Sequence, residues 1–160
     1  MAGRDFKRPA GLALALGLAL AFAGGGALAL SAEQTVKARQ ESFKALGGAF
    51  KTINDGLKAD QPNLPGIAAA AGRMLALSQT VPGLFPKASG PETGAKMRAK
   101  AEIWTDPAGF AAAAQGLQAE TAKLQSLALA GDVEAVRAQV RATGGACRTC
   151  HTKFRAEEQR

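Results

Sequence analysis

The 160-residue chain contains no tyrosine, one tryptophan, one histidine and two cysteines. With so few Cys and His residues, it cannot supply the four nitrogen or sulfur ligands of a usual structural zinc site. Its basic charge, formally +7, is not accompanied by an aromatic-rich patch, which argues against nucleic-acid binding. Residues that favour strands are scarce beside Ala, Leu, Gln, Glu and Lys, so the composition predicts an all-α protein.

The cysteines and the histidine lie together in Cys147-Arg148-Thr149-Cys150-His151, near the C-terminus. This C-x-x-C-H pattern is the attachment motif of c-type haem. Each thiol can form a thioether with a vinyl group, and the adjacent imidazole can reach the iron as an axial ligand. Because the motif occurs once, it predicts one covalent haem c on Cys147 and Cys150, with His151 as the iron ligand.

Other interpretations of the motif are weaker. A zinc site lacks a fourth ligand, and a thioredoxin-like redox pair expects a βαβ context that this sequence does not have. A disulfide between Cys147 and Cys150 is sterically poor on a continuous helix, because the two Cβ vectors diverge. A helical protein in which the motif is accidental is the remaining alternative.

The N-terminus has the pattern of an export signal. A segment with three cations precedes the apolar run at residues 11–23, and small residues follow it. We expect cleavage after Ala29, with cleavage after Ala32 or an uncleaved anchor as alternatives, although the run is short for a membrane span. The chain then divides into a signal peptide (1–32) and a mature domain (33–160), which we expect in the periplasm and not in a membrane.

Apolar residues recur at helical spacing in four segments of the mature domain. The predicted helices are residues 33–58, 66–80, 107–131 and 132–154, with one further turn near residues 95–100. The residues expected to be buried are Val36, Gln40, Phe43, Gly47, Phe50, Asn54 and Leu57 in the first helix, Ile67, Ala70, Met74, Leu77 and Val81 in the second, Phe110, Leu117, Leu124 and Leu127 in the third, and Val133, Val136, Val140, Thr143, Cys147, Cys150, His151 and Phe154 in the fourth.

The attachment motif therefore lies on the apolar face of the last helix. Four helices with one apolar face each predict a four-helix bundle with a covalent haem in its core. The chain resembles the cytochromes c′, the class II c-type cytochromes. The matching segments are ARQESF at residues 38–43, EIWTD at 102–106 and GGACRTCHTKFR at 144–155. The resemblance implies an antiparallel up-down-up-down bundle with the haem attached near the end of the fourth helix.

The resemblance also implies roles on the first helix. Arg39, with Gln40 beside it, matches the pair that meets a haem propionate, and Phe43 matches the residue on the distal side of the iron. Low-spin relatives carry a methionine ligand there, and phenylalanine cannot coordinate. The chain has no second histidine and no tyrosine, and its mature methionines are Met74 and Met97. We expect five-coordinate, high-spin iron, with ligation by Met97 as the alternative.

Three further residues match positions near the haem in the family. Arg98 and Trp104 fall in the stretch that passes the haem edge, and Arg155 matches a basic residue near the proximal face. Simpler interpretations exist: a solvated helix charge for Arg39, a loop cation for Arg98, a core aromatic for Trp104 and a surface cation for Arg155.

Two functions are compatible with these expectations, and neither is enzymatic. The first is binding of nitric oxide and carbon monoxide at an open iron position, combined with a capacity for electron transfer. The second is a dedicated electron shuttle with a six-coordinate, Met-ligated, low-spin haem and periplasmic redox proteins as partners. The family resemblance further implies a homodimer.

Overall fold

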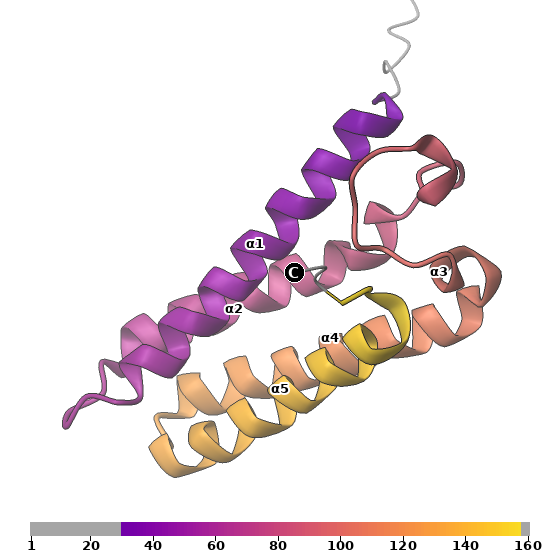
Figure 1. The fold of residues 1–160 in the computed structure, drawn as a ribbon. Coiled ribbons are helices and arrows are strands. Elements are labelled where there is room, and N and C mark those ends of the chain that lie inside the picture. Colours follow the sequence, from indigo (N-terminus) through magenta and orange to yellow (C-terminus); the bar gives the residue numbers. More distant parts are fainter. Residues whose placement is uncertain (1–29, 158–160) are drawn as a thin grey trace, which may run out of the picture.

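Four long helices dominate residues 30–157, the part of the chain that the computed structural model describes (Figure 1). The signal peptide predicted from the sequence lies almost wholly outside these residues. Within them no helix is apolar and long enough to cross a membrane. The elements in chain order are α1 (Ala32–Gly56), α2 (Leu64–Thr80), the 3-10 turns η1 (Val81–Leu84) and η2 (Pro91–Thr93), α3 (Glu102–Thr105), α4 (Pro107–Ala130) and α5 (Val133–Phe154).

Each long helix begins at a side-chain cap that satisfies a free backbone N–H group. Ser31 accepts a bond from the Gln34 amide, and the Gln34 side chain accepts one from the Ser31 amide, which forms a capping box before α1. Asn63, Asp106 and Asp132 each accept a bond from the amide three residues later, at the starts of α2, α4 and α5. These local signals explain why the helix starts follow from the sequence.

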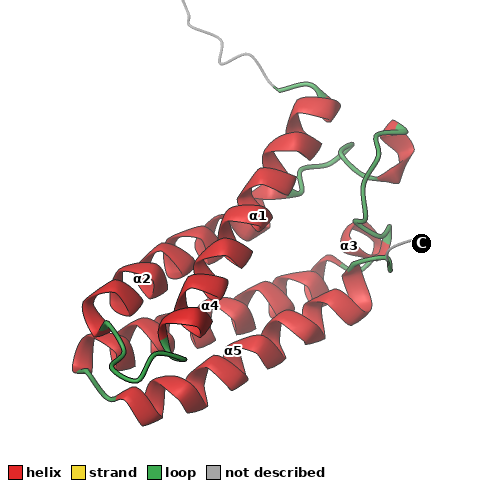
Figure 2. Cartoon of the chain, turned by 60° about the vertical axis from the view of Figure 1, so that its left-hand side comes forward, coloured by secondary structure: helices red, strands yellow, loops and turns green. Residues whose placement is uncertain are grey.

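The helices form the predicted antiparallel four-helix bundle. α1 packs on α2, α2 on α4, and α4 on α5. Figures 1 and 2 show that the N-terminal half of α1 diverges from the C-terminal half of α5, with the connection between α2 and α4 at this end of the bundle. The long connection therefore lies at the end of the bundle where α1 and α5 diverge.

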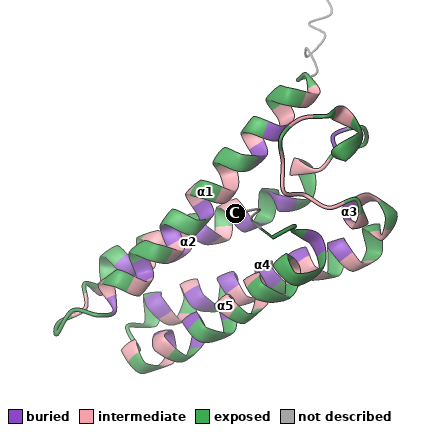
Figure 3. Ribbon diagram, viewed as in Figure 1, coloured by how far each residue is buried: buried purple, intermediate pink, exposed green. Residues whose placement is uncertain are grey.

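The core contains residues from all four long helices, and buried positions recur along each of them (Figure 3). Ile53, Met74, Leu124 and Val136, one from each helix, are fully buried. Burying a side chain of this size contributes about 1.5–3 kcal/mol. The expected core positions Ile67, Phe110, Leu117, Val140 and Phe154 are also buried.

The predicted buried face of α1 is partly wrong. Gln40 and Gly47 are exposed, whereas Leu46, Ala49 and Ile53 lie in the core. The two phenylalanines of this helix are only partly buried and pack on the core from the edge of the face. Their rings are long enough to reach the core from there. The apolar face predicted from these two residues is therefore rotated by about one residue relative to the observed buried face.

The predicted helical turn near residues 95–100 is also wrong. Helical turns form instead at η2 and α3, on either side of this segment. The backbone of Arg98 and Lys100 is extended and bonds to the chain that leaves α5: the Lys100 amide donates to the Phe154 carbonyl at 3.0 Å, and the Ala156 amide donates to the Arg98 carbonyl at 2.8 Å. These long-range bonds replace the helical ones.

Candidate haem-binding site

The two cysteines of the motif lie one turn apart on α5, both partly buried and packed against the hydrophobic core. Both are free thiols. Burial raises the pKa of each thiol, and at Cys150 the nearby Cys147 raises it further. The two sulfurs are therefore kept as protonated thiols on the inner side of the helix, which is the side on which a core-bound haem would be attached.

His151 lies at the edge of that face and is exposed, although the sequence pattern placed it among the buried residues. Its pKa is lowered by partial desolvation, and by the positive charges of Arg155 and Arg98. A lowered pKa favours the neutral imidazole, the form that binds a metal ion. No group of three or more Cys, His, Asp or Glu side chains within residues 30–157 is arranged to hold a metal ion, so the zinc alternative gains no support.

Arg39 is buried, with an exposed fraction of 4%. Its Nε donates to the Leu84 carbonyl at 2.9 Å, and its Nη2 donates to the Ser89 carbonyl at 3.0 Å and the Ser89 hydroxyl at 2.7 Å. The guanidinium carbon lies 4.3 Å from the ring centroid of Phe85 and 5.5 Å from that of Trp104. The interpretation of Arg39 as a solvated helix charge is therefore wrong.

The charge of Arg39 has no carboxylate partner in the part of the chain that the structure describes, and desolvation lowers its pKa. Burying an ion without an opposite charge is costly, so the site favours an added anion. A haem propionate is an anion that fits, because a carboxylate pairs well with a guanidinium. The half-buried thiols, the neutral imidazole and this unpaired cation together form a set of groups that suits a covalent haem.

The remaining residues of α1 that the sequence singled out lie next to Arg39. Gln40 is exposed, and its Nε2 donates to the Lys96 carbonyl at 3.1 Å. Phe43 is partly buried one turn later and packs edge to face on Phe85, with ring centroids 6.1 Å apart. Gln40 therefore holds the connection between α2 and α4, and Phe43 faces an aromatic cluster.

Arg98 and Trp104 lie on the connection between α2 and α4. The Nε of Arg98 donates to the Ala156 carbonyl at 2.9 Å, next to the end of α5. The indole Nε1 of Trp104 donates to the Pro86 carbonyl at 3.0 Å, and its ring packs on Phe85 and on the core. The structure thus brings both residues to the end of the bundle where α5 carries the attachment motif.

Two further residues contribute to this region, and no periodic pattern in the sequence marks them. Phe85 contacts the rings of Phe43, Trp104 and Phe110, and Ser89 binds Arg39. Both lie in a connection rich in proline and glycine, where no periodicity marks an inward-facing side chain. The only hint is a phenylalanine placed between Gly83 and Pro86, in a stretch that otherwise reads as loop.

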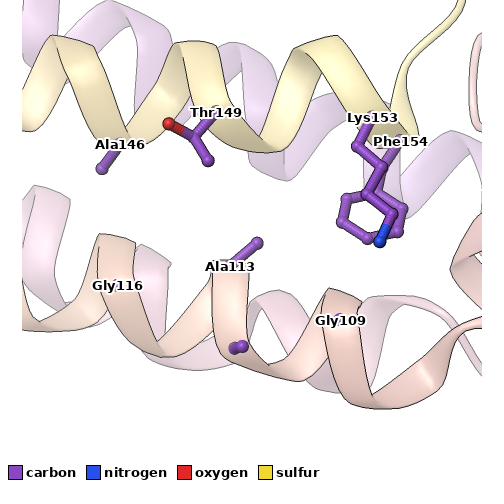
Figure 4. A pocket seen from close by; sticks show the side chains of 8 residues that line it. Gly109, Ala113, Gly116, Ala146, Thr149, Lys153 and Phe154 are labelled. Atoms are coloured by element: carbon purple, nitrogen blue, oxygen red, sulfur yellow. The ribbon is translucent and has the colours of Figure 1, made fainter.

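Two pockets at the protein surface lie away from the cysteine and histidine side chains of the motif, although Thr149 of the motif lines the first. One, of about 390 Å³, lies between α4 and α5 (Figure 4). Another, of about 420 Å³, lies between the start of α1 and the segment after η1. Neither is lined by the two cysteines or the histidine. The lining residues of the first are Gly109, Ala112, Ala113, Gly116, Ala146, Thr149, Lys153 and Phe154.

Comparison with known proteins gives a consistent result. The family model described as Cytochrome C′ matches residues 34–155. Cytochrome c′ from Rubrivivax gelatinosus is 35% identical over 122 residues, which cover 75% of this chain and 92% of that protein. Cytochrome c′ from Rhodospirillum rubrum is 34% identical over 122 residues, covering 76% of this chain and 82% of the relative.

Solved structures share the fold. A nitric oxide complex of a variant of cytochrome c prime from Alcaligenes xylosoxidans has a TM-score of 0.72 and 27% identity, covering 79% of this chain and 97% of the other. A cytochrome c′ with a ligand-controlled dimer dissociation has a TM-score of 0.75 and 25% identity, covering 81% and 99%. Together with the attachment motif, these findings show that the chain belongs to the cytochrome c′ family, whose members carry covalently bound haem c.

Proposed function

We propose that this protein is an exported, periplasmic mono-haem cytochrome that binds nitric oxide and carbon monoxide at an open iron position. The observation that carries the proposal is Phe43, a side chain that cannot coordinate iron, one turn after the buried Arg39 on α1. Within residues 30–157 no second histidine and no tyrosine exists to take its place. The iron is then five-coordinate and high-spin.

In this proposal the motif residues attach and orient the haem. Cys147 and Cys150 form the thioethers, and His151 is the proximal ligand. The haem supplies the iron at which diatomic ligands bind and through which electrons pass. The neutral state of the imidazole, favoured by its lowered pKa, supplies a nitrogen lone pair without prior loss of a proton.

The other site residues surround the haem. Arg39 neutralises a propionate, while Gln40 fixes the connection beside it. Arg98 and Trp104 lie along the haem edge, and Arg155 places a positive charge on the proximal side. Phe43 covers the distal side with an apolar ring. Because residues 30–157 contain no distal histidine or tyrosine to donate a hydrogen bond, dioxygen binds poorly, whereas the less polarised carbon monoxide and nitric oxide bind.

The proposal also covers partners. The protein binds gases and exchanges electrons with periplasmic redox proteins, and it is not an enzyme. A solved relative is described by its ligand-controlled dimer dissociation, which supports a homodimer for this chain as well.

A second candidate is a shuttle with a low-spin haem ligated by Met97. The observation that favours it is the place of Met97 at the same end of the bundle, where its sulfur lies 3.8 Å from Nη1 of Arg39. This arrangement puts a thioether beside the α1 segment that precedes Phe43.

Optical spectra of the purified, exported protein distinguish the two candidates. The ferric and ferrous forms are expected to be high-spin, and the ferrous spectrum should change when carbon monoxide is added. Met97→Leu should give the same spectra as the wild type. Failure to bind carbon monoxide at any pressure, together with fast electron exchange, would favour the shuttle.

A further inference from the structure

Met97 is held between the two segments that border the proposed haem site. On one side, Lys96 accepts a bond from Gln40 on α1 at 3.1 Å. On the other, Arg98 exchanges bonds with Ala156, just after α5, at 2.8 Å and 2.9 Å. The residues next to Met97 in the chain are thus fixed to both helices.

The thioether itself contacts Arg39. Nη1 of Arg39 donates to the sulfur of Met97 at 3.8 Å. Sulfur is a weak acceptor, so this contact determines the position of the side chain only if the donor is itself fixed. The other two nitrogens of Arg39 are bound to Leu84 and Ser89, and the group is buried between two aromatic rings. Since the guanidinium is planar and rigid, these bonds also fix the direction of Nη1.

The donors of Arg39 are nearly all in use. A guanidinium has five N–H groups. Nε donates to Leu84, Nη2 makes two bonds to Ser89, and Nη1 makes one contact, to Met97. One Nη1 hydrogen remains for an anion such as a propionate. An added carboxylate can therefore bind without releasing the sulfur.

We propose that Arg39 is a positioning residue that holds the Met97 thioether against α1 and thereby keeps it from becoming a second axial ligand. The proposal rests on the proposed function, in which Phe43 covers an open iron position. Thioether sulfur is an effective ligand of haem iron, so a methionine at this end of the bundle would compete for that position if it were free. The Arg39–Met97 contact explains how the chain keeps a nearby methionine without a low-spin haem.

The test uses the haem-loaded protein and four forms: wild type, Arg39→Lys, Met97→Leu and the double variant. Lysine keeps a positive charge for a propionate but lacks the fork that binds three partners in fixed directions. We expect Arg39→Lys to raise the ratio of low-spin to high-spin haem by about tenfold, the change expected when one contact of a charged donor is lost. The double variant should again show the high-spin spectrum of the wild type. The control Arg73→Lys, a substitution at an exposed position on α2, should leave that spectrum unchanged.

Optical and electron paramagnetic resonance spectra give the spin state. A loss of folding alone would not produce a low-spin signal that depends on Met97. A high-spin Arg39→Lys protein in a high-spin wild-type background would overturn this proposal and leave the proposed function standing. A low-spin signal that persists in the double variant would overturn it too. A wild type that is already low-spin through Met97 would overturn both. If Arg39→Lys does not load haem, Ser89→Ala removes only one acceptor of Arg39, and an unchanged spin state there counts against the proposal.

Discussion

The rings of Phe43 and Phe85 meet edge to face, with their centroids 6.1 Å apart, and Phe85 is itself packed 4.8 Å from Phe110. Phe85 is also covered on another side by the guanidinium of Arg39 at 4.3 Å. The residue proposed to cover the iron therefore leans on a ring that is itself held in place. Movement of Phe43 toward Phe85 requires the whole aromatic cluster to shift.

Carbon monoxide should accordingly bind slowly. In Phe43→Ala the ring no longer has to move, so the association rate is expected to rise by about two- to tenfold, since an aromatic pair contributes about 0.5–1.5 kcal/mol. Stopped-flow mixing of the ferrous protein with carbon monoxide measures this rate. Phe50→Ala, two turns further along α1, serves as the control and should leave the rate nearly unchanged. An equal effect of both substitutions would show that general loosening of the bundle is responsible.

Replacing Phe43 by methionine should change the coordination of the iron. A thioether at this place on α1 can serve as the sixth ligand, so the spectrum of Phe43→Met is expected to move toward a six-coordinate, low-spin form. Optical spectra of the ferric and ferrous protein provide the measurement. The assignment of the distal position is wrong if the wild type is already low-spin and loses that signal in Met97→Ala.

Both thiols of the motif should be needed for covalent attachment. Haem is expected to stay with the wild-type protein through acidic organic extraction, whereas Cys147→Ala combined with Cys150→Ala should yield no covalent haem. The double variant should also be less stable than the wild type, because a core built around a haem is left with a cavity when the haem is missing. Absorbance of the extracted and protein fractions measures attachment, and extractable haem in the wild type would refute the assignment of the motif.

The features that sequence predicts well here are local. Asp106 and Asp132 cap α4 and α5 through bonds to residues only three positions away, so these two helix starts follow from a short segment. The motif and the apolar face of α5 are equally local. Cys147 and Cys150 pack on the core as their spacing indicates.

The features that sequence does not predict depend on contacts between distant segments. Arg39 is buried because Leu84 and Ser89, about fifty residues later, supply carbonyl and hydroxyl oxygens. The extended backbone of Arg98 is fixed by Ala156 in the same way. Neither contact produces a periodic pattern in the sequence. The sequence of α1 or of the connection taken alone therefore cannot predict either contact.

The cap at Ser31 bears on the two expected cleavage sites. Cleavage after Ala29 keeps Ser31 and its capping box with Gln34, whereas cleavage after Ala32 removes the cap. We expect the mature protein to begin at Leu30, and mass spectrometry of the exported protein measures this directly. Ser31→Ala should lower the free energy of unfolding by about 1 kcal/mol, as for other caps. A mature N-terminus at Glu33 would contradict the expectation.

Arg155 lies one turn after His151, and its amide donates to the His151 carbonyl at 3.1 Å. Its backbone also pairs with Ala99 of the connection. The positive charge of Arg155 contributes to the lowered pKa of His151. The side chain therefore acts on His151 by its charge, while the backbone holds the connection.

Arg155→Ala separates these two contributions, because it removes the charge and leaves the backbone contacts. If nitric oxide displaces His151 on the proximal side, a cation there stabilises the resulting complex, so the substitution should change the nitric oxide product more than the carbon monoxide product. Spectra recorded after mixing with each gas measure the two products. Arg148→Ala, which removes an exposed arginine near the end of α5, is the matched control. Equal changes with both gases, or the same change in Arg148→Ala, would mean that Arg155 has no specific part in a proximal route.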